Sequence, residues 1–242
     1  MKTHAENKII LSVVMPVYNE QDGINEAVAD VQKHVLSCVE GSELVAVNDG
    51  SRDNTGLLLD NAAKEDYRIN VIHQENQGHG GALMTGLNRA RGEYLFLVDS
   101  DSQIPLNGFA RAWEMVQEGR DGVFGIRRNR QDPRIRLALS ALIRHVLRVM
   151  FSTRIYDANV PFKLVHRSIW ERAARHIPPD TLAPSLFLAL YANTNGYDVC
   201  EMDVPHKERD TGEVSIQRMK LVKFCATAFG QLLSFRRELR RA

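Results

Sequence analysis

The sequence is poor in cysteine and lacks long apolar runs, and each shortage excludes a class of protein. The three cysteines, Cys38, Cys200 and Cys225, are odd in number and show neither CxxC nor metal-ligand spacing. A disulfide framework and a zinc site are therefore not expected, and the cysteine content suits a reducing cytosol. No run reaches the roughly 18–20 apolar residues of a membrane span, and residues 1–7 lack an apolar leader. We expect neither a membrane-spanning helix nor an export signal.

Charge is almost balanced overall but differs between the two halves of the chain. The 242 residues fit one large domain, and their 44% apolar and 25% charged content is ordinary for a globular protein. Residues 1–120 hold 10 Lys and Arg against 18 Asp and Glu, whereas residues 121–242 hold 21 against 12. This split predicts an anionic partner or surface for the second half, unless the charges segregate by chance. Nucleic acid is the least favoured partner, because no aromatic residues interleave with the arginines.

Short apolar runs alternate with segments of helical periodicity. This alternation predicts βαβ units, and hence an α/β fold with a mostly parallel central sheet flanked by helices. Pro16 is expected to end the first strand, and Asp22 and Ser168 are expected to begin helices. Right-handed crossovers place the loops after the first, second and fourth strands along one edge of the sheet. The expected strands are 9–15, 44–47, 69–72, 94–98, 121–126 and 199–204, and residues 156–164 could return the chain to the sheet.

The fourth of these strands leads into clustered carboxylates. The apolar run Tyr94–Val98 is followed directly by Asp99-Ser100-Asp101-Ser102-Gln103, and open α/β sheets bind ligands at the carboxyl ends of their strands. Two carboxylates one residue apart, together with the amide oxygen of Gln103, suit a hard cation, Mg²⁺ or Mn²⁺, shared with a diphosphate. The alternative is a polar turn that caps a helix beginning near Leu106.

Two more loops at this edge carry side chains that can bind a nucleoside. Tyr18 can stack on a ring, and Glu20 can accept hydrogen bonds from ribose hydroxyls. Asp49 and Asp53 flank a glycine turn and can accept bonds from a base or a ribose, although either loop could also be a plain turn. The glycine-rich residues 76–82 open a helix whose N–H groups could face phosphate, and close packing explains them equally well. Three acid-bearing loops on one edge together predict a cleft for a nucleotide and a metal.

The second half of the chain contains two basic helical segments. In residues 134–151 an apolar arc too wide for a solvated helix lies beside a polar stripe. We expect a membrane-surface helix or a partner contact there, with a deeply buried helix as the alternative. Residues 216–242 are expected to form a basic amphipathic tail that lies on an anionic membrane, unless its first half packs on the core. The stripe consists of Arg136, Ser140, Arg144 and Arg148.

Residues 206–215 form a polar loop between the last expected strand and this tail. Arg209 and Ser215 lie in it with other basic and small residues, and such a loop could clamp an anion. We place the catalytic domain at 1–215 and the tail at 216–242.

Five motifs occur in the order seen in family 2 glycosyltransferases, which the chain resembles. Within that family it most resembles the dolichol-phosphate mannosyltransferase and polyprenyl-phosphate glycosyltransferase group. That likeness comes from Asp101 with Gln103, from Phe162-Lys163-Leu164, and from a loop with His206, Arg209 and Gly212. The chain departs from the group's pattern at 159–161 and at 213–215. The five motifs are Val13–Glu20, Val47–Asp53, Asn76–Gly78, Asp99–Asp101 and Gly125–Arg127.

The resemblance implies a GT-A-like nucleotide-sugar-binding domain with assigned roles for particular side chains. Asp101, Arg127 and Arg209 would be catalytic, the two arginines facing the phosphate of the acceptor, with Ser215 beside them. Asp99, Asp101 and Gln103 would surround Mg²⁺ or Mn²⁺ and the diphosphate. The nucleoside would be held by Pro16, Tyr18, Glu20, Asp49 and Asp53.

The predicted activity is inverting transfer of a sugar from a nucleotide-diphosphate-sugar, such as GDP-mannose or a UDP-hexose, to a polyprenyl or dolichyl phosphate. Many members of the family that transfer sugars to hydroxyl groups carry an acidic base at the position of Leu182–Ser185. This chain has no acid among those four residues, and Asp180 is the acid nearby. A phosphate monoester is mostly dianionic at pH 7, since its second pKa is about 6, and it needs no base. We expect a cytoplasmic protein held peripherally at the cytosolic membrane face. The alternatives are a transferase to a hydroxyl group with Asp180 as base, and a noncatalytic nucleotide-sugar-binding protein.

Overall fold

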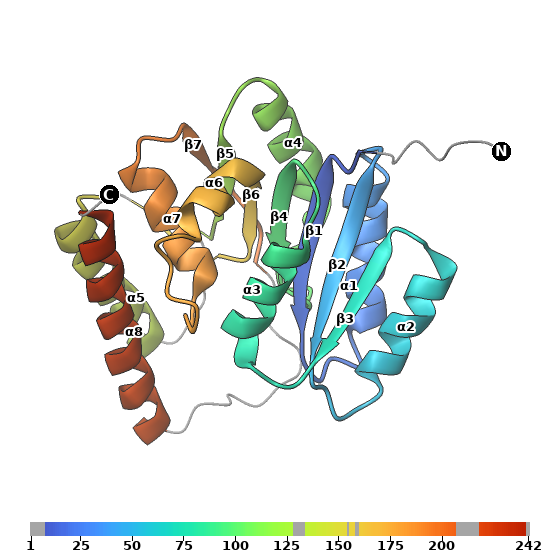
Figure 1. Ribbon diagram of the computed structural model, residues 1–242, viewed down its shortest axis with the longest axis horizontal. Helices are drawn as coiled ribbons and strands as arrows, with labels where there is room; N and C mark the ends of the chain where they lie inside the picture. The colour runs from blue at the N-terminus through green and yellow to red at the C-terminus, as the bar shows by residue number, and fades with distance from the viewer. Residues whose placement is uncertain (1–7, 128–133, 154, 158–159, 207–217, 241–242) are drawn as a thin grey trace.

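The computed structural model describes residues 8–127, 134–153, 155–157, 160–206 and 218–240, which build one seven-stranded sheet flanked by helices (Figure 1). The α/β prediction is thus confirmed. The strands are β1 (Leu11–Val17), β2 (Ser42–Asp49), β3 (Ile69–Gln74), β4 (Tyr94–Val98), β5 (Gly122–Ile126), β6 (Phe162–His166) and β7 (Val199–Asp203). The helices are α1 (Ile24–Val31), α2 (Thr55–Glu65), α3 (Gly78–Arg89), α4 (Phe109–Gln117), α5 (Arg134–Phe151), α6 (Arg167–Ala173), α7 (Pro184–Thr194) and α8 (Arg218–Leu239), with short turns η1 (Gln32–Leu36) and η2 (Leu106–Gly108).

The strand order is β3-β2-β1-β4-β6-β5-β7. β6 runs antiparallel to both of its neighbours, and the remaining pairs are parallel. The chain proceeds from β1 outward to β3 and then returns to place β4 on the other side of β1. The carboxyl ends of β1, β2 and β4 therefore lie at one edge, as predicted, and the direction of strand order switches between β1 and β4. Such a switch point is where open α/β sheets bind ligands.

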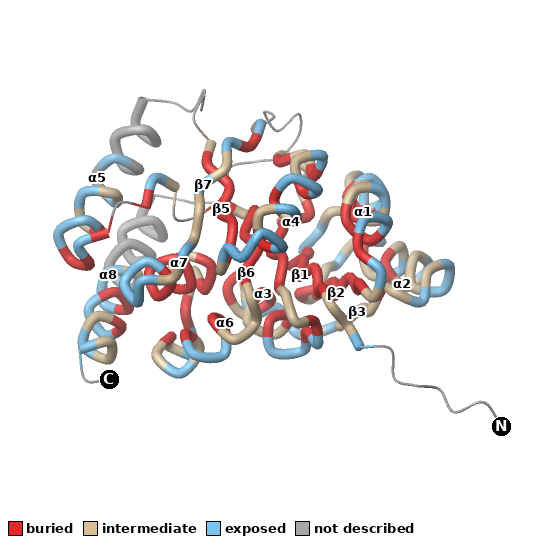
Figure 2. Tube along the Cα trace, turned by 90° about the horizontal axis from the view of Figure 1, so that it is seen from above, coloured by how far each residue is buried: buried red, intermediate tan, exposed pale blue. Residues whose placement is uncertain are grey.

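Alternate residues of the strands face two hydrophobic cores, because successive side chains of a strand point to opposite faces. Val13 and Met15 pack into the core that α1, α2 and α4 cover. Val14 packs on the other face, which α3, α6 and α7 cover together with parts of α5 and α8. Figure 2 shows the buried strands running between these helices.

Three local predictions were wrong. Pro16 lies inside β1, opposite Val47, because the pairing of β1 with β4 already ends at Val14 and a proline is tolerated where one neighbour is absent. Gly23, rather than Asp22, precedes the first turn of α1, without a side-chain cap. α6 begins one residue before Ser168, and the ring of His166 accepts a hydrogen bond from the Ser168 N–H at its start.

α5 and α8 lie side by side at the end of the molecule remote from β3, and both views agree on this (Figures 1 and 2). The rings of Phe151 on α5 and Phe235 on α8 are 6.0 Å apart. Leu147, Met150 and Phe151 are buried, whereas Ile143 and Val149 are 45% and 65% exposed. The last turn of α5 therefore contributes to the core. The wide apolar arc predicted for this helix is divided between the core and the surface. No helix in the described part of the chain is long and apolar enough to cross a bilayer.

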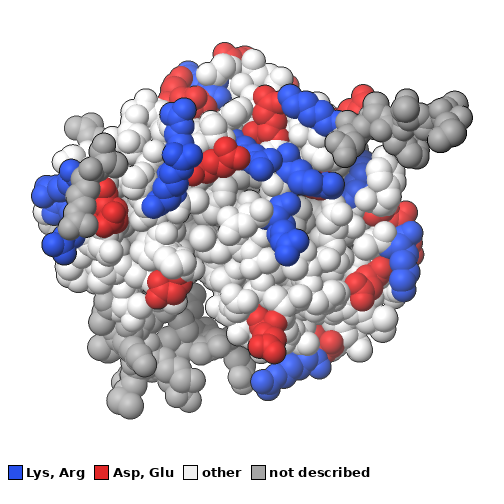
Figure 3. All heavy atoms as spheres, viewed as in Figure 1, with Lys and Arg blue, Asp and Glu red and all other residues white. Residues whose placement is uncertain are grey.

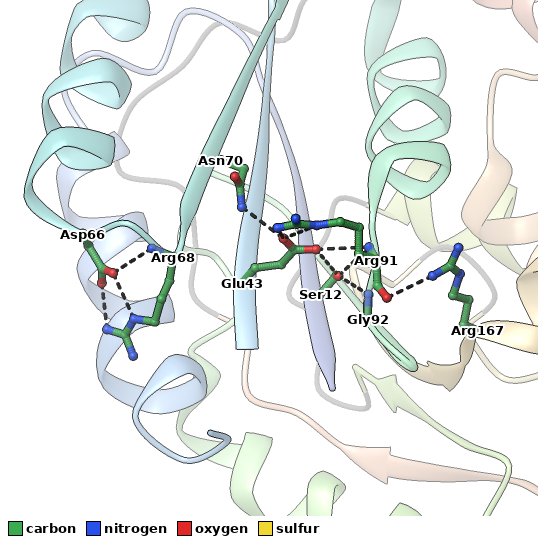
Figure 4. A network of polar contacts seen from close by, with 8 residues as sticks. All are labelled: Ser12, Glu43, Asp66, Arg68, Asn70, Arg91, Gly92 and Arg167. Carbon is green, nitrogen blue, oxygen red and sulfur yellow. Dashed lines mark hydrogen bonds and ion pairs between the residues drawn. The ribbon is translucent and has the colours of Figure 1, made fainter. Parts of the chain in front are cut away.

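A buried polar network joins three strands at the amino edge of the sheet (Figure 4). The Glu43 carboxylate, 2% exposed, accepts hydrogen bonds from Ser12 Oγ at 2.7 Å and from Asn70 Nδ2 at 3.1 Å. The main-chain N–H of Arg91, at 3.1 Å, and its guanidinium also donate to this carboxylate. The Ser12 hydroxyl accepts from the N–H of Gly92 at 2.8 Å. These contacts hold the α3–β4 connection against β1 and β2.

Candidate functional site

A hollow of about 370 Å³ opens at the switch point between β1 and β4. Its walls come from the loops after β1, β2 and β4 and from the first turns of α3. These are the loops that the sequence placed at one edge. The lining residues are Pro16, Val17, Tyr18, Glu20, Asp49, Asn76, Gly78, His79, Ala82, Asp99, Ser100 and Asp101.

Asp99 and Asp101 stand at the tip of β4, as predicted. Asp101 Oδ1 accepts a hydrogen bond from the Gln103 N–H at 3.1 Å, which holds the turn closed. Ser102, between Asp101 and Gln103, has a left-handed φ of +53°, and its buried Oγ has no hydrogen-bond partner. A non-glycine residue in this conformation costs of the order of 1–3 kcal/mol, and such residues cluster at binding sites. The turn therefore keeps a strained form that brings both carboxylates to the hollow.

His79 reaches this carboxylate pair from the first turn of α3. Its Nε2 lies 3.1 Å from Asp99 Oδ1, and the side chain is 58% exposed. The hydrogen bond to Asp99 raises the pKa of the imidazole, against the effect of partial desolvation. The charges of Asp101 and Asp49 act in the same direction. The protonated form of His79 is thus favoured by an acidic hollow. Nothing in the glycine-rich stretch, read by itself, had indicated this contact.

The carboxylate pair fits Mg²⁺ or Mn²⁺ held jointly with a substrate. Among the described side chains, no cluster of three or more His, Cys, Asp or Glu could enclose a metal alone. Mg²⁺ in particular keeps several waters and is bound through one or two carboxylates plus substrate phosphates, so Asp99 and Asp101 are a sufficient protein contribution. Gln103 does not appear among the residues that line the hollow, and its role as a ligand stays a prediction.

Asp49 is 2% exposed and shapes the hollow as well as lining it. Its Oδ1 accepts from Gln74 Nε2 at 2.7 Å and from the Gln77 N–H at 2.8 Å. Gly50 follows with φ +69°, and a Cβ there would lie 2.8 Å from the N atom of Asn76. The tip of β2 therefore positions the residues that enter α3.

Tyr18 and Glu20 line the hollow next to Asp49, with Tyr18 43% exposed. Asp53 instead ties two loops together: Oδ2 accepts from the Gln21 N–H at 3.3 Å and Oδ1 from the Thr55 N–H at 3.0 Å. Burial alone would raise the pKa of Asp53, but these hydrogen bonds outweigh it and lower the pKa overall. Asp53 supports the loop that carries Glu20, and direct contact with a nucleoside stays a prediction.

Arg127 directly follows β5 and is clamped by Asp157. Its Nε lies 2.8 Å from Oδ2 and its Nη2 lies 3.1 Å from Oδ1, with both side chains nearly buried. Such a bidentate pair fixes the plane of the guanidinium. The family resemblance predicts a role for Arg127 but not its pairing with Asp157, which lies 30 residues away. Arg209 and Ser215 lie outside the described residues.

Lys163 on β6 is completely buried close to this pair. Its ammonium donates to the Val160 carbonyl at 2.5 Å and to Ser185 Oγ at 2.7 Å. Burial lowers its pKa to about 7, and the charge of Arg127 adds to this, whereas Asp157 and Asp99 oppose it. The lysine links the segment before β6 to the start of α7.

A second hollow, of about 570 Å³, adjoins the first at Gly78 and His79. The loop 179–182 forms its other wall and includes Asp180. On the face shown in Figure 3, acidic and basic side chains lie near one another around a broad uncharged middle.

The chain is similar to transferases that act on undecaprenyl phosphate. It is 29% identical over 221 residues to the undecaprenyl-phosphate 4-deoxy-4-formamido-L-arabinose transferase of Shewanella sediminis, covering 90% of this chain and 65% of that protein. The enzyme of the same name from Pseudomonas aeruginosa is 32% identical over 217 residues, covering 88% and 62%. The chain thus spans under two thirds of the length of these curated relatives.

Solved structures share the fold at low sequence identity. The glucosyl-3-phosphoglycerate synthase of Mycobacterium tuberculosis, in complex with Mn²⁺, UDP and phosphoglyceric acid, superposes with a TM-score of 0.65 at 17% identity, covering 94% of this chain and 78% of that one. A mannosyltransferase of Pyrobaculum calidifontis, in complex with GDP-Man and Mn²⁺, gives 0.63 at 20% identity, covering 92% and 62%. The GT-A-like fold is therefore confirmed. The profile of glycosyl transferase family 2 matches residues 12–174, the span that contains β1 to β6 and the whole first hollow, and the chain belongs to that family.

Proposed function

We propose that this chain transfers a sugar from a nucleotide-diphosphate-sugar to a polyprenyl phosphate. The observation that carries the proposal is the first hollow, where a carboxylate pair, an aromatic ring and two further acids meet at the switch point of the sheet. Family membership and the names of the undecaprenyl-phosphate relatives support the reaction class and the acceptor. The structures of fold relatives with UDP or GDP-Man and Mn²⁺ support a nucleotide donor and a divalent metal.

Each wall of the hollow has a role in this reaction. Tyr18, Glu20 and Asp49 hold the nucleoside, and Asp99 and Asp101 hold Mg²⁺ or Mn²⁺ beside the diphosphate. A bound divalent cation stabilises the negative charge that develops on the leaving diphosphate. His79, whose Nε2 lies 3.1 Å from Asp99 Oδ1, helps to orient that carboxylate.

We assign the acceptor phosphate to the second hollow and to Arg127, which is not among the residues that line either hollow. The Asp157 clamp holds the Arg127 guanidinium in one orientation, which suits the binding of an acceptor phosphate. The dianionic phosphate oxygen attacks the anomeric carbon and the nucleoside diphosphate leaves, so that no proton has to be removed. A transferase to a hydroxyl group, with Asp180 in the second hollow as base, would need that removal.

We further propose that the chain docks on the cytosolic face of an anionic membrane through the outer surface of α5 and α8. Four large apolar side chains on these helices are about half exposed or more, and Arg148 and Arg237 are exposed on the same helices. Each basic residue near an anionic leaflet contributes about 1 kcal/mol. The exposed apolar residues are Ile143, Val149, Phe229 and Leu233.

The proposed reaction is tested by transfer assays with GDP- and UDP-sugars and Mn²⁺, using polyprenyl phosphate and the matching polyprenol as acceptors. We expect transfer to the phosphate alone, loss of activity in EDTA with recovery in Mn²⁺ or Mg²⁺, and inactivity of Asp101→Ala. Asp22→Ala removes an exposed aspartate outside the hollow and serves as the control. Transfer to the polyprenol would favour the hydroxyl mechanism, and donor binding without turnover would favour a noncatalytic role.

A further inference from the structure

Residues 178–183 form a loop that includes the wall of the second hollow, and the side of this loop that faces the hollow packs on α3. Thr181 is 3% exposed, and its N–H donates to the Pro178 carbonyl at 3.1 Å. Gly80 of α3 packs directly on it, since a Cβ at Gly80 would lie 2.3 Å from the Thr181 carbonyl oxygen. His79, the neighbour of Gly80, contacts Asp99. The loop is therefore in direct contact with the first turn of α3.

The opposite side of the loop is held by one amide from the C-terminal helix. Gln231 on α8 is 8% exposed; its Oε1 accepts from the Leu182 N–H at 3.2 Å and its Nε2 donates to the Asp180 carbonyl at 3.0 Å. The donor and acceptor of one side chain thus bind the main chain on either side of Thr181. Two hydrogen bonds from a planar amide set both the distance and the orientation of the segment.

α8 has its own anchor in the core, independent of this contact. Leu232 and Phe235 are buried, and the Phe235 ring lies 4.9 Å from the Phe187 ring of α7. Phe229 and Leu233 on the same helix are each 48% exposed. The helix therefore has an inner face that includes Gln231 and an outer face that is open to solvent or a membrane.

We infer that Gln231 is a positioning residue, through which the seating of α8 sets the shape of the second hollow. The inference rests on the proposed function, in which the transferred sugar and the acceptor phosphate meet where the two hollows adjoin. The inference gives the C-terminal helix a role in acceptor binding, although Gln231 is not among the residues that line either hollow. We expect the first hollow to keep its shape when the amide is removed, because both bonds of Gln231 go to the loop residues Asp180 and Leu182, which do not line that hollow.

The kinetic test uses Gln231→Met, which keeps the length of the side chain and removes both hydrogen bonds. We expect kcat/KM for polyprenyl phosphate to fall about tenfold, chiefly through KM of the acceptor, while the Kd of the nucleoside diphosphate stays within about twofold. Gly80→Ala displaces the same loop from the opposite side and should give the same split, whether or not Gln231→Met folds well. Ser234→Ala, exposed on the same helix, should match the wild type.

Hydrogen exchange supplies a readout that does not depend on activity. Amides of residues 180–183 should exchange faster in Gln231→Met than in the wild type or Ser234→Ala. Unchanged exchange, or faster exchange with wild-type KM and kcat, would overturn the inference. If the wild type transferred no sugar while Gln231→Met still loosened the loop, the proposed function would fail and the coupling between helix and loop would stand.

Discussion

Replacing Glu43 should destabilise the fold strongly while leaving the hollow intact. Glu43→Ala removes the acceptor of the buried Ser12 Oγ and of two partly buried donors, the Asn70 amide and the Arg91 main-chain N–H, the last of which also donates to Ser12 Oγ. A hydrogen bond to a charged group contributes about 1.5–3 kcal/mol net. The Arg91 side chain is 63% exposed, so its ion pair adds at most about 1 kcal/mol. We expect the free energy of unfolding to fall by about 3–5 kcal/mol.

The assay is urea unfolding at 25 °C with linear extrapolation, comparing variants whose m-values agree. Glu43→Gln should lose about 2 kcal/mol, because it keeps an acceptor for Ser12 Oγ and the Arg91 N–H but turns an NH₂ group toward the Asn70 amide and the Arg91 guanidinium. Glu65→Ala, at an exposed position of α2, should stay within about 0.5 kcal/mol of the wild type. Nucleotide binding at low temperature should be unchanged in all three, because the network lies at the opposite edge of the sheet. A loss below about 1 kcal/mol in Glu43→Ala would show that water replaces the carboxylate, and would refute the reasoning.

Three further predictions concern charge. Burial disfavours the protonated form of Lys163, so the folded chain binds fewer protons than the unfolded one between pH 7 and 10.5. The unfolding free energy of the wild type should therefore rise with pH across this window relative to that of Lys163→Met. Parallel curves of unfolding free energy against pH for the two proteins would contradict this. Arg127→Ala should raise KM of the polyprenyl phosphate about ten- to a hundredfold with little change in donor Kd, and a selective loss of donor affinity would place the guanidinium at the diphosphate instead. Sedimentation with vesicles over a salt series should show binding to anionic but not neutral lipid that weakens with salt and is reduced in Leu233→Ser; equal recovery in the supernatant with both lipids would refute docking.

The parts of the site that come directly after strands could be predicted from sequence. An apolar run ending in acids, such as Tyr94–Val98 before Asp99, favours a buried strand of a parallel sheet, because burial requires the run and the carboxyl edge exposes the residues that come next. The same logic placed Tyr18 and Asp49 at the hollow. Local rules failed at Pro16, where β1 has lost its pairing with β4, and at Asp22, where Gly23 takes the position before the helix.

The contacts that organise the site across long sequence distances could not be predicted. Arg127 and Asp157 are 30 residues apart, and Gln231 lies 51 residues from Asp180. Neither pair leaves a periodicity or spacing signal, because the partners meet only after the sheet and helices have packed. Lys163 shows the same limit: its motif contributed to the family resemblance, while its burial depends on β5 and α7 closing around it.

Because β6 runs antiparallel to β5, the connection between these two strands leaves the sheet and returns to it at the same edge. β5 ends at the ligand-binding edge, and β6, because it runs backwards, begins at that same edge, with Phe162 opposite Val98. The Arg127–Asp157 ion pair joins the two ends of this connection at its base. A change of length between these two ends therefore carries a modest loop-closure cost and leaves the strands that carry the carboxylates in register, provided that Leu147, Met150 and Phe151 of α5 keep their places in the core.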